Sequence, residues 1–273
     1  MENLGRIKTR LETMSELGEL VSALRSMSAS RSREAQKALK GTRAYCEVVE
    51  RAIAEVSLLL PDGVGSAKQR DSAALLVMTS ENGFVGPFNA RLIDHALEVR
   101  KPEEYLIICG RRGLIVASER GVADAVPVPM TSRVQGITML ARKIASELSG
   151  FTAARIVFAR HLPGAALETT VRTVLPLGET FRIPGPILPV VHVSPDELLS
   201  QLALEYLFAE TAHCLMESLA CENAARMRAM DSASRNIEEN VDALQREERV
   251  ARQEKTTTEM LDVVTGVEAV NHD

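Results

Sequence analysis

The last quarter of the chain decides its fold. Residues 196–265 read DELLSQLALEYLFAETAHCLMESLACENAARMRAMDSASRNIEENVDALQREERVARQEKTTTEMLDVVT, without a proline or a glycine. Ser194 and Pro195 precede this run as an N-cap and a first helical residue, and Gly266 follows it as the expected end. A helix of about 70 residues would be roughly 105 Å long at about 1.5 Å per residue. Since no compact domain can bury such a helix, it needs a partner helix.

The other end of the chain supplies that partner, a second long helix predicted over residues 3–60. Its apolar and small residues recur at alternating three- and four-residue spacing, which is typical of a coiled-coil seam. Small residues at 26–32 would let a second helix approach closely, and Pro61 to Gly63 would end the helix. The seam positions are Leu4, Ile7, Leu11, Met14, Gly18, Val21, Arg25, Ser28, Leu39, Val49, Ile53, Val56 and Leu60.

Composition and charge restrict the class of protein. The 273 residues include 3% aromatics and no tryptophan, a bias that suits long helices. The net charge of −5 does not favour a nucleic-acid partner, which would require a basic domain. No apolar run reaches the length of about 20 residues that a membrane span needs, and the N-terminus does not resemble a signal peptide. The four cysteines lack C-x-x-C spacing, so we expect reduced thiols.

The middle of the chain, residues 72–193, predicts a compact, Rossmann-like α/β domain in which short apolar runs alternate with amphipathic helices. The sequence therefore divides into an N-terminal coiled-coil helix at 1–60, this domain, and a C-terminal coiled-coil helix at 194–273. Strands are expected at 73–78, 105–109, 114–116, 154–159 and 168–175, the last at an edge; helices at 90–100 and 132–148; a loop at 80–89; and a turn at 110–113.

Chain order makes the two long helices antiparallel, because one runs into the α/β domain and the other runs out of it. The last helix should be longer by roughly 12–15 residues, so that its end projects by about 20 Å. Its seam is predicted at Leu202, Ala209, Met216, Ala220, Met227, Ile237, Val241 and Leu244. Its acid-to-arginine pairs at i,i+4 are Glu222–Arg226, Asp231–Arg235, Asp242–Arg246 and Glu248–Arg252, mostly on a solvated face.

Motifs for common enzyme chemistry are missing from the sequence. There is no P-loop, dinucleotide fingerprint, H-E-x-x-H or G-x-S-x-G, and the five histidines are scattered. His213 is expected to be a packed or a surface residue rather than a ligand. Gly110 to Gly113 is a weak candidate for a nucleotide site. The loop 80–89 is a candidate active-site loop by its position after the first strand, with a structural turn that needs Gly83 and Gly86 as the plainer explanation. Three classes stay open at this point: a shaft-like coiled-coil protein, a coiled-coil scaffold or adaptor, and a small α/β nucleotide-binding enzyme.

The chain resembles the gamma subunit of F-type ATP synthases along most of its length. The most specific match is residues 217–230, ESLACENAARMRAM, followed by Arg252-Gln253, Thr257, Glu259, Val264 and Gly266. Residues 10–14, 29–36, 79–89 and 110–113 are also similar to that family. Glu19, Ser22, Asn82, Lys255 and Thr256 depart from the family pattern. These departures suggest a divergent branch of the family, and both the housekeeping enzyme and an alternative H⁺- or Na⁺-translocating F-type ATPase stay open.

The resemblance implies a central-stalk rotor without catalytic residues, cofactor or metal of its own. Its partners would be the alpha and beta subunits, the epsilon subunit and the membrane c-ring, which would hold it peripherally at the cytoplasmic face of a bacterial inner membrane. The coupling ion, the net direction and the regulation stay open.

The resemblance also implies three sets of partner-contact residues. Arg252, Gln253, Thr257 and Glu259 would contact the upper part of the alpha/beta hexamer. Leu24, Arg25 and Arg226 would lie near the lower lever of beta. Residues near Tyr206 and Cys46 would face the rotor ring. The apolar tip, suited to a bearing, would comprise Met260, Leu261, Val263, Val264 and Val267.

Overall fold

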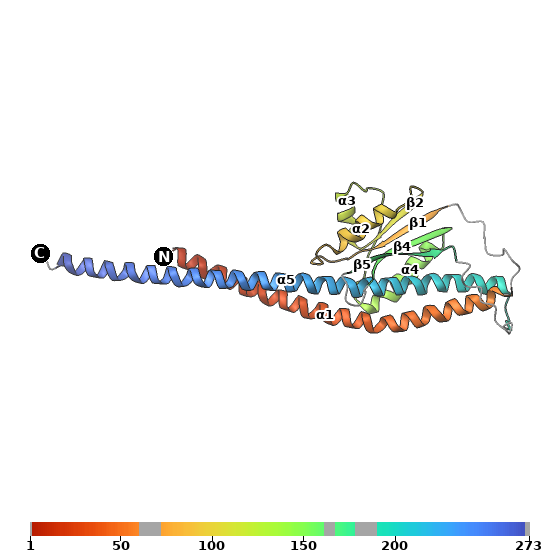
Figure 1. Ribbon diagram of the computed structural model, residues 1–273, viewed down its shortest axis with the longest axis horizontal. Coiled ribbons are helices and arrows are strands. Elements are labelled where there is room, and N and C mark those ends of the chain that lie inside the picture. Colours follow the sequence, from red (N-terminus) through yellow and green to blue (C-terminus); the bar gives the residue numbers. More distant parts are fainter. Residues whose placement is uncertain (1, 60–71, 161–166, 178–189, 271–273) are drawn as a thin grey trace. The chain divides into compact units, whose positions relative to one another are not determined.

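A computed structural model describes residues 2–59, 72–160, 167–177 and 190–270 (Figure 1). The chain forms two units. The first, here called the coil unit, consists of Met1–Met27 with Met227–Asp273. The second, here called the sheet unit, consists of Ser28–Arg226. The predicted end of the first helix at 61–63 lies outside the described residues.

Two long helices contribute to both units. They are α1, Glu2–Ser57, with 56 residues, and α5, Pro195–Val270, with 76 residues. Contacts between them run in opposite sequence directions within each unit, so the pair is antiparallel as predicted. In the coil unit, Arg25 Nε lies 2.5 Å from Asp231, and Gly18 lies opposite Ile237.

The start of α5 follows the sequence prediction. Ser194 Oγ accepts a hydrogen bond from the Glu197 amide at 3.2 Å, which is an N-cap geometry, and Pro195 is the first helical residue. The predicted end at Gly266 is wrong, because α5 continues to Val270. A glycine within a helix costs only about 1 kcal/mol relative to alanine, which one position can absorb.

The length difference between the helices exceeds the prediction. Helix α1 ends at Ser57 rather than at residue 60, and α5 is 20 residues longer than α1 (76 against 56). At about 1.5 Å per residue, this difference is roughly 30 Å of helix.

Small residues allow α1 and α5 to approach closely in the sheet unit. Ser28, Ser32 and Ala35 are buried on α1. The Ser32 hydroxyl donates to the Ala220 carbonyl across the helix pair at 3.1 Å. A backbone can be reached in this way only where no bulky side chain intervenes, so the prediction for residues 26–32 is confirmed at Ser28 and Ser32.

A five-stranded sheet forms the centre of the sheet unit, with strand order β3-β2-β1-β4-β5. All pairs are parallel except β4 with β5, which is antiparallel. Strand β5 lies at an edge of the sheet, as predicted. The strands are β1 (Ala73–Met78), β2 (Glu104–Cys109), β3 (Val126–Val128), β4 (Ala153–Arg160) and β5 (Glu168–Leu175). The remaining helices are α2 (Phe88–Val99), α3 (Arg111–Glu119), the short 3₁₀ helix η1 (Val134–Gly136) and α4 (Ile137–Leu148).

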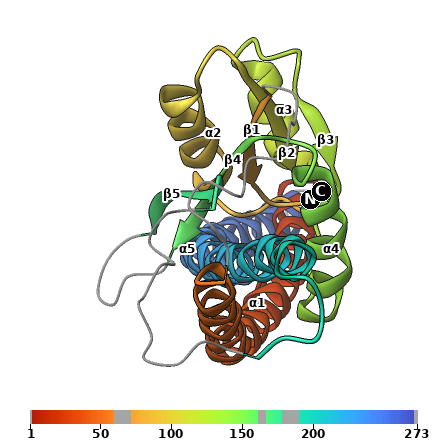
Figure 2. The same cartoon turned by 90° about the vertical axis from the view of Figure 1, so that its right-hand side faces the viewer.

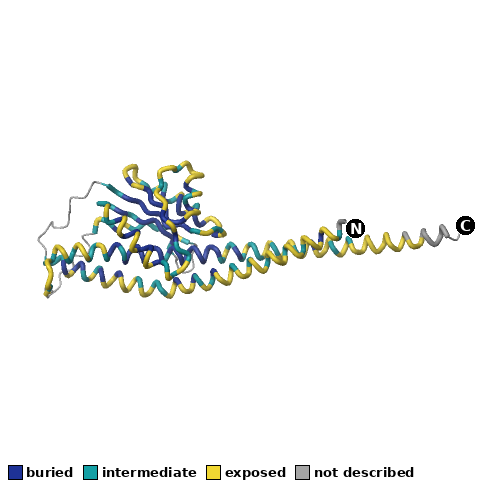
Figure 3. Tube along the Cα trace, turned by 180° about the vertical axis from the view of Figure 1, so that it is seen from behind, coloured by how far each residue is buried: buried dark blue, intermediate teal, exposed yellow. Residues whose placement is uncertain are grey.

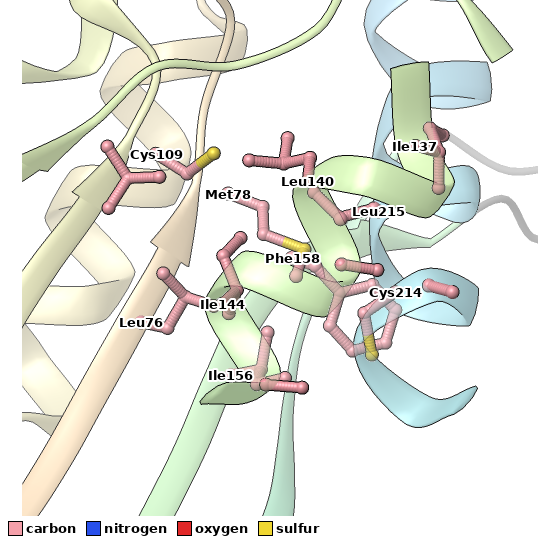
Figure 4. Close-up of a cluster of buried hydrophobic side chains, with 14 of the residues drawn as sticks. Leu76, Met78, Cys109, Ile137, Leu140, Ile144, Ile156, Phe158, Cys214 and Leu215 are labelled. Atoms are coloured by element: carbon pink, nitrogen blue, oxygen red, sulfur yellow. The ribbon is translucent and has the colours of Figure 1, made fainter. Parts of the chain in front are cut away.

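Helices cover both faces of this sheet (Figure 2). Strand β1 shows why, because its residues are buried on both sides and alternate between two cores. Leu75 and Val77 pack with α2 and α3. Leu76 and Met78 pack with α4 and with α5 residues such as Leu215 (Figure 4).

The middle of α5 is buried around its whole circumference. From Tyr206 to Arg226 every residue except Phe208 and Glu217 is buried (Figure 3). This segment contacts the sheet on one side and α1 on the other, as Ser218 and Ser32 illustrate: Ser218 Oγ donates to the Met78 carbonyl at the end of β1. A helix in such a position is expected to be largely apolar around its circumference, and the polar residues that it buries need partners inside the protein, as Ser218 has.

The prediction for residues 110–116 is wrong. Residues 111–116 form the first part of α3, with Gly110 as its N-cap, rather than a turn and a short strand, and the third strand is β3. Leu114 and Val116 pack against the α2/α3 core from a helix. An apolar run of three residues cannot distinguish helix from strand by periodicity.

The cysteines and histidine follow the predictions. All four cysteines are free and buried. His213 is buried, with Nδ1 lying 3.3 Å from Thr42 Oγ1 and Nε2 lying 3.4 Å from Glu217. Among the described residues, no helix has the combination of length and apolar character that a membrane span requires.

Candidate functional site

The C-terminal part of α5 presents an exposed surface in the coil unit. Every residue from Arg252 to Leu261 is exposed, which includes the predicted contacts Gln253, Thr257 and Glu259. Met260, Leu261, Val263 and Val264 expose 68%, 59%, 66% and 54% of their surfaces. Four large apolar side chains in this state on one helical segment are typical of an interaction surface. The side chain of Val267 lies outside the described ones.

The polar side chains of this segment form ion pairs and hydrogen bonds within α5. Arg252 forms an ion pair with Glu248 at 2.8 Å, and Lys255 lies 3.5 Å from Glu259. The Thr257 hydroxyl donates to the Gln253 carbonyl at 2.9 Å. These contacts within α5 help to stabilise a solvated helical segment.

A groove lies between α1 and α5 in the coil unit, and two of the predicted contact residues line it. Its volume is about 840 Å³, and Leu11 and Val241 contribute apolar surface to it. Arg252 and Gln253 line the same groove. The structure therefore joins these two residues to the N-terminal helix, a neighbourhood that the sequence did not indicate.

Leu24 and Arg25 lie on α1 within the coil unit. Leu24 is half-buried, while Arg25 is exposed and pairs with Asp231 of α5. The prediction paired Asp231 with Arg235 along its own helix, whereas the structure places it against α1. This ion pair occupies the seam position where the sequence lacks an apolar residue.

Arg226 lies in a buried polar network of the sheet unit. Its guanidinium pairs with Glu222 at 2.7 Å and donates to the carbonyls of Gly83 at 3.1 Å and Asn82 at 3.3 Å. The two side chains of the pair expose only 9% and 2% of their surfaces. The prediction of a solvated i,i+4 pair is therefore wrong at this position, because the loop after β1 covers it.

Burial governs the electrostatics of this network. It raises the pKa of Glu222, and the guanidinium of Arg226 opposes that rise, with a smaller contribution from Arg31 of α1. Arg226 thus compensates a buried carboxylate and fastens the loop to α5 at the same time.

The loop at 80–89 is also held by hydrogen bonds near the N-terminus of α3. One carboxylate oxygen of Glu81 accepts hydrogen bonds from the amides of Arg111 at 3.2 Å and Met130 at 3.1 Å. The N-terminus of a helix is a ready anion site, and in this chain the protein's own carboxylate fills it.

Close packing explains why glycines occupy positions 110 and 113 at the start of α3. Gly110 has a φ of 109°, and a Cβ atom there would lie 2.7 Å from the carbonyl oxygens of Thr79 and Ser80. A Cβ atom on Gly113 would lie 2.0 Å from Thr79 Oγ1. Both glycines therefore serve the close packing of α3 on the end of β1.

Phe84 is the unusual residue of this loop. It has a φ of 62° without being a glycine, and it exposes 70% of its surface. A left-handed conformation costs a bulky residue roughly 1–2 kcal/mol. Because the ring of Phe84 is exposed, burial of the ring does not offset that cost. The sequence indicated glycine freedom at Gly83 and Gly86; Gly86 has a φ of 56°, but the second left-handed position is Phe84.

Tyr206 and Cys46 lie inside the sheet unit. They expose 7% and 5% of their surfaces and pack with Val49, Ile53 and Ala209. Burial, with a smaller effect of Glu210, raises the pKa of Cys46 to about 12. Their side chains are therefore not on the surface that a ring contact would use.

Neighbouring residues supply an exposed apolar patch, here called the basal patch. It comprises Tyr45 and Val48 of α1 and Leu204 of α5, which expose 40%, 57% and 50% of their surfaces. The Tyr45 ring meets Phe208 edge-on at 6.3 Å, and Arg142 lies over the Phe208 ring at 4.7 Å. Sequence reasoning missed this patch because it followed the seam residues rather than their neighbours.

A polar cavity lies on the Tyr206 side of the helix pair. Its volume is about 330 Å³ and its lining includes Arg172, whose guanidinium pairs with Glu210 at 2.6 Å. No group of three or more side chains suited to holding a metal ion occurs among the described residues.

Known proteins match this chain over nearly its whole length. A family model described as ATP synthase matches residues 3–270. Proteins named ATP synthase gamma chain from Sulfurihydrogenibium sp. (strain YO3AOP1) and Bdellovibrio bacteriovorus are 27% and 24% identical to this chain; the alignments cover 97% and 99% of this chain and the same shares of theirs.

Solved structures show the same fold. A chain of the Euglena gracilis mitochondrial ATP synthase (OSCP/F1/c-ring, rotational state 3) matches with a TM-score of 0.66 and 14% identity, over 98% of this chain and 95% of that one. A chain of the Tetrahymena thermophila mitochondrial ATP synthase central stalk/c-ring matches with a TM-score of 0.59 and 16% identity, over 79% and 99%. On the family match over nearly its whole length, the chain belongs to the ATP synthase family.

Proposed function

We propose that this chain is the gamma-type rotor subunit of an F-type ATP synthase central stalk. The observation that carries the proposal is the continuity of α5. One helix has a segment buried against the sheet and α1, and a C-terminal segment whose described side chains are all exposed from Arg252 onward. A helix anchored at one end and bare at the other suits transmission of torque to a surrounding partner.

The work of such a subunit is mechanical rather than catalytic. Ion flow through a membrane ring turns the stalk, and the stalk makes different contacts with each of three catalytic beta subunits at each angle. A contact shifts the conformation of a subunit only by the difference in its free energy between two states. Rotation would therefore impose unequal nucleotide affinities on the three sites, and hydrolysis would drive the rotation backwards.

The C-terminal end of α5 would contact the alpha/beta hexamer. Arg252, Gln253, Thr257 and Glu259 would meet the upper part of the alpha/beta hexamer. The apolar tip that includes Leu261 and Val264 would turn in it as a weakly specific bearing. Four exposed apolar side chains can slide against a smooth apolar surface because hydrophobic contact is non-directional.

Leu24 and Arg25 would lie near the lower lever of beta. Arg226 would act there indirectly, since its guanidinium is engaged with Glu222 and the loop after β1. The contact with the membrane rotor ring was predicted near Tyr206 and Cys46. Because those two side chains are buried, the exposed basal patch around Tyr45 would make this contact instead. The epsilon subunit would bind the α/β domain. The complex would place the chain at the cytoplasmic face of a bacterial inner membrane.

The two alternatives make different predictions. A nucleotide-binding α/β enzyme would use the N-terminus of α3, which Glu81 occupies, or the end of β1, where Ser218 of α5 donates to the Met78 carbonyl. A coiled-coil scaffold would associate with itself or with another cytosolic protein.

The test is reconstitution with the alpha and beta subunits encoded in the same genome. We expect the chain to join them in a stoichiometric complex whose ATP hydrolysis depends on its presence. An unrelated antiparallel coiled coil of equal length serves as the control. Failure of the chain to associate, or equal hydrolysis with the control coil, would overturn the proposal.

A further inference from the structure

His213 lies where α1, β4 and α5 meet in the sheet unit, and its two ring nitrogens face different partners. The residue is buried, with 6% of its surface exposed. Nδ1 lies 3.3 Å from Thr42 Oγ1 on α1, and Nε2 lies 3.4 Å from Glu217 Oε1 on α5. Arg160 of β4 lies 3.9 Å from the other oxygen of Glu217. These four side chains therefore connect the helix pair to the sheet.

The hydroxyl of Thr42 can serve His213 in either protonation state. It has one hydrogen, and the Leu39 carbonyl lies 3.0 Å away as a second acceptor besides Nδ1. Beside a neutral ring, the hydroxyl donates to Nδ1, while the Nε2 hydrogen faces Glu217. Beside a charged ring, Nδ1 donates to the hydroxyl, which turns its hydrogen to the Leu39 carbonyl. Burial normally opposes a charge on histidine, but here an added proton finds an acceptor already in place.

Glu217 lacks the hydrogen bonds that a buried carboxylate needs. Its side chain exposes 13% of its surface, and its buried Oε2 atom has no hydrogen-bond partner among the residues that the structure describes. The 3.9 Å to Arg160 is too long for a hydrogen bond. Because a buried charge is costly unless it is paired, a positive charge on His213 would stabilise this carboxylate.

The polar cavity of about 330 Å³ lies beside His213 and gives it access to water. Arg43 and Glu47 line this cavity, and both side chains are exposed. Burial raises the pKa of Cys46 to about 12 and also raises the pKa of Tyr206, so both groups stay neutral near pH 7. The described ionisable groups that face His213 are Arg43, Cys46, Glu47 and Glu50 of α1, Arg160 of β4, Arg172 of β5, and Tyr206, Glu210 and Glu217 of α5.

These groups carry an excess of one negative charge, because four carboxylates face three guanidinium groups. Arg172 and Glu210 neutralise each other at 2.6 Å. Burial, with a smaller effect of Glu210, raises the pKa of Glu50, as expected where carboxylates crowd together. A proton on His213 would supply the missing positive charge.

We propose that His213 and Glu217 form a pH-sensitive clasp, in which His213 takes up a proton from water and then holds α5 more firmly to α1 and β4. The proton enters through the cavity and forms one new N–H bond, and the carboxylate keeps its charge. In the unfolded chain an ordinary imidazole releases its proton near about pH 6.5. The stability that the clasp contributes is therefore complete below that pH and is lost as the pH rises further.

Urea denaturation of the isolated chain at pH 6 and pH 8 tests the proposal. The folded-to-unfolded ratio should increase between pH 8 and pH 6 by a factor several-fold larger in the parent than in His213→Gln, which cannot take up the proton. Glu217→Gln removes the charge that pairs with the imidazolium and should reduce the response in the same way. His192→Gln removes an exposed histidine and should respond as the parent does.

Nitrogen NMR of the parent chain supplies a second measurement that requires no variant to fold. We expect the ring of His213 to gain its second N–H bond between pH 8 and pH 6. A ring that stays neutral over this range would overturn the proposal, and so would equal pH responses of the parent and His213→Gln. Both measurements use the isolated chain, so failure to assemble with alpha and beta subunits would overturn the rotor proposal alone.

Discussion

The Glu222–Arg226 pair shows what a single residue contributes to the sheet unit. On sequence, it is one of four similar i,i+4 pairs along α5. In the structure it is nearly fully buried, and its arginine also binds the backbone of the loop after β1. Local spacing could predict the pair, but only the tertiary contact with the loop decides that it is buried.

Arg226→Ala should be strongly destabilising, because it leaves the buried Glu222 carboxylate without its partner. We expect a loss of about 3–5 kcal/mol in the free energy of unfolding, measured by urea denaturation. Arg228→Ala, at an exposed position two residues further along α5, is the matched control and should change stability little. Equal losses in the two variants would contradict the assignment.

Phe84 allows a comparison between two small substitutions. Alanine keeps the cost of a left-handed backbone, whereas glycine removes it, so Phe84→Gly should be more stable than Phe84→Ala by about 1 kcal/mol. Thermal and urea denaturation of the isolated chain measure the difference. At an ordinary helical position the order reverses, so an Ala variant more stable than the Gly variant would show that φ at residue 84 is not positive in solution.

Two buried thiols predict how stability depends on pH. Burial raises the pKa of both Cys46 and Cys109 from 9.0 to about 12. The folded state therefore keeps these protons while the unfolded state releases them, and stability should fall as pH rises from about 9 towards about 12. Urea denaturation at pH 8 and pH 10 should show a larger loss for the parent than for the Cys46→Ala/Cys109→Ala variant. Identical losses would contradict the raised pKa values.

At the scale of elements, the sequence predicted the two long helices correctly but only some of the positions at which they begin and end. The absence of proline and glycine, with Ser194 as a cap, was sufficient for the start of α5. The end was missed because one glycine does not stop a helix. Residues 110–116 were misassigned because a three-residue apolar run lacks a period, and because the reason for Gly113, its contact with Thr79, lies in another element.

The close approach of α1 and α5 depends on small residues at their contact. Ser32→Leu should destabilise the sheet unit by about 1–3 kcal/mol, since the larger side chain must enter the space between Ser32 and the Ala220 backbone. Ser30→Leu places the same side chain at an exposed position of α1 and is the control. Calorimetry of both variants checks the prediction, which fails if the two melt at the same temperature.

At the scale of the whole molecule, the sequence predicted the fold class and the exposed C-terminal segment, but not the basal patch or the network around Arg226. Seam periodicity reports which residues face a partner helix. It does not report which neighbours stay exposed when a third layer, the sheet, packs on the same helix.

Removal of residues 257–273 should weaken coupling more than it weakens folding. The described side chains in this segment are exposed, so their loss removes little packing. We expect the truncated chain to keep helicity in proportion to its length and to unfold at almost the same urea concentration as the full chain. Ion-driven ATP synthesis by the complex should fall. Wholesale loss of helicity, or full ion-driven synthesis, would contradict this expectation.

The most direct test of the rotor proposal is to observe this chain turning. The alpha and beta subunits are fixed to a surface, and a probe is attached to an added cysteine on the exposed face of α2, after the four buried cysteines are replaced. On addition of ATP, the account predicts continuous rotation of the probe in one direction, which stops when ATP is withdrawn. Steady ATP hydrolysis with a stationary probe would contradict the account.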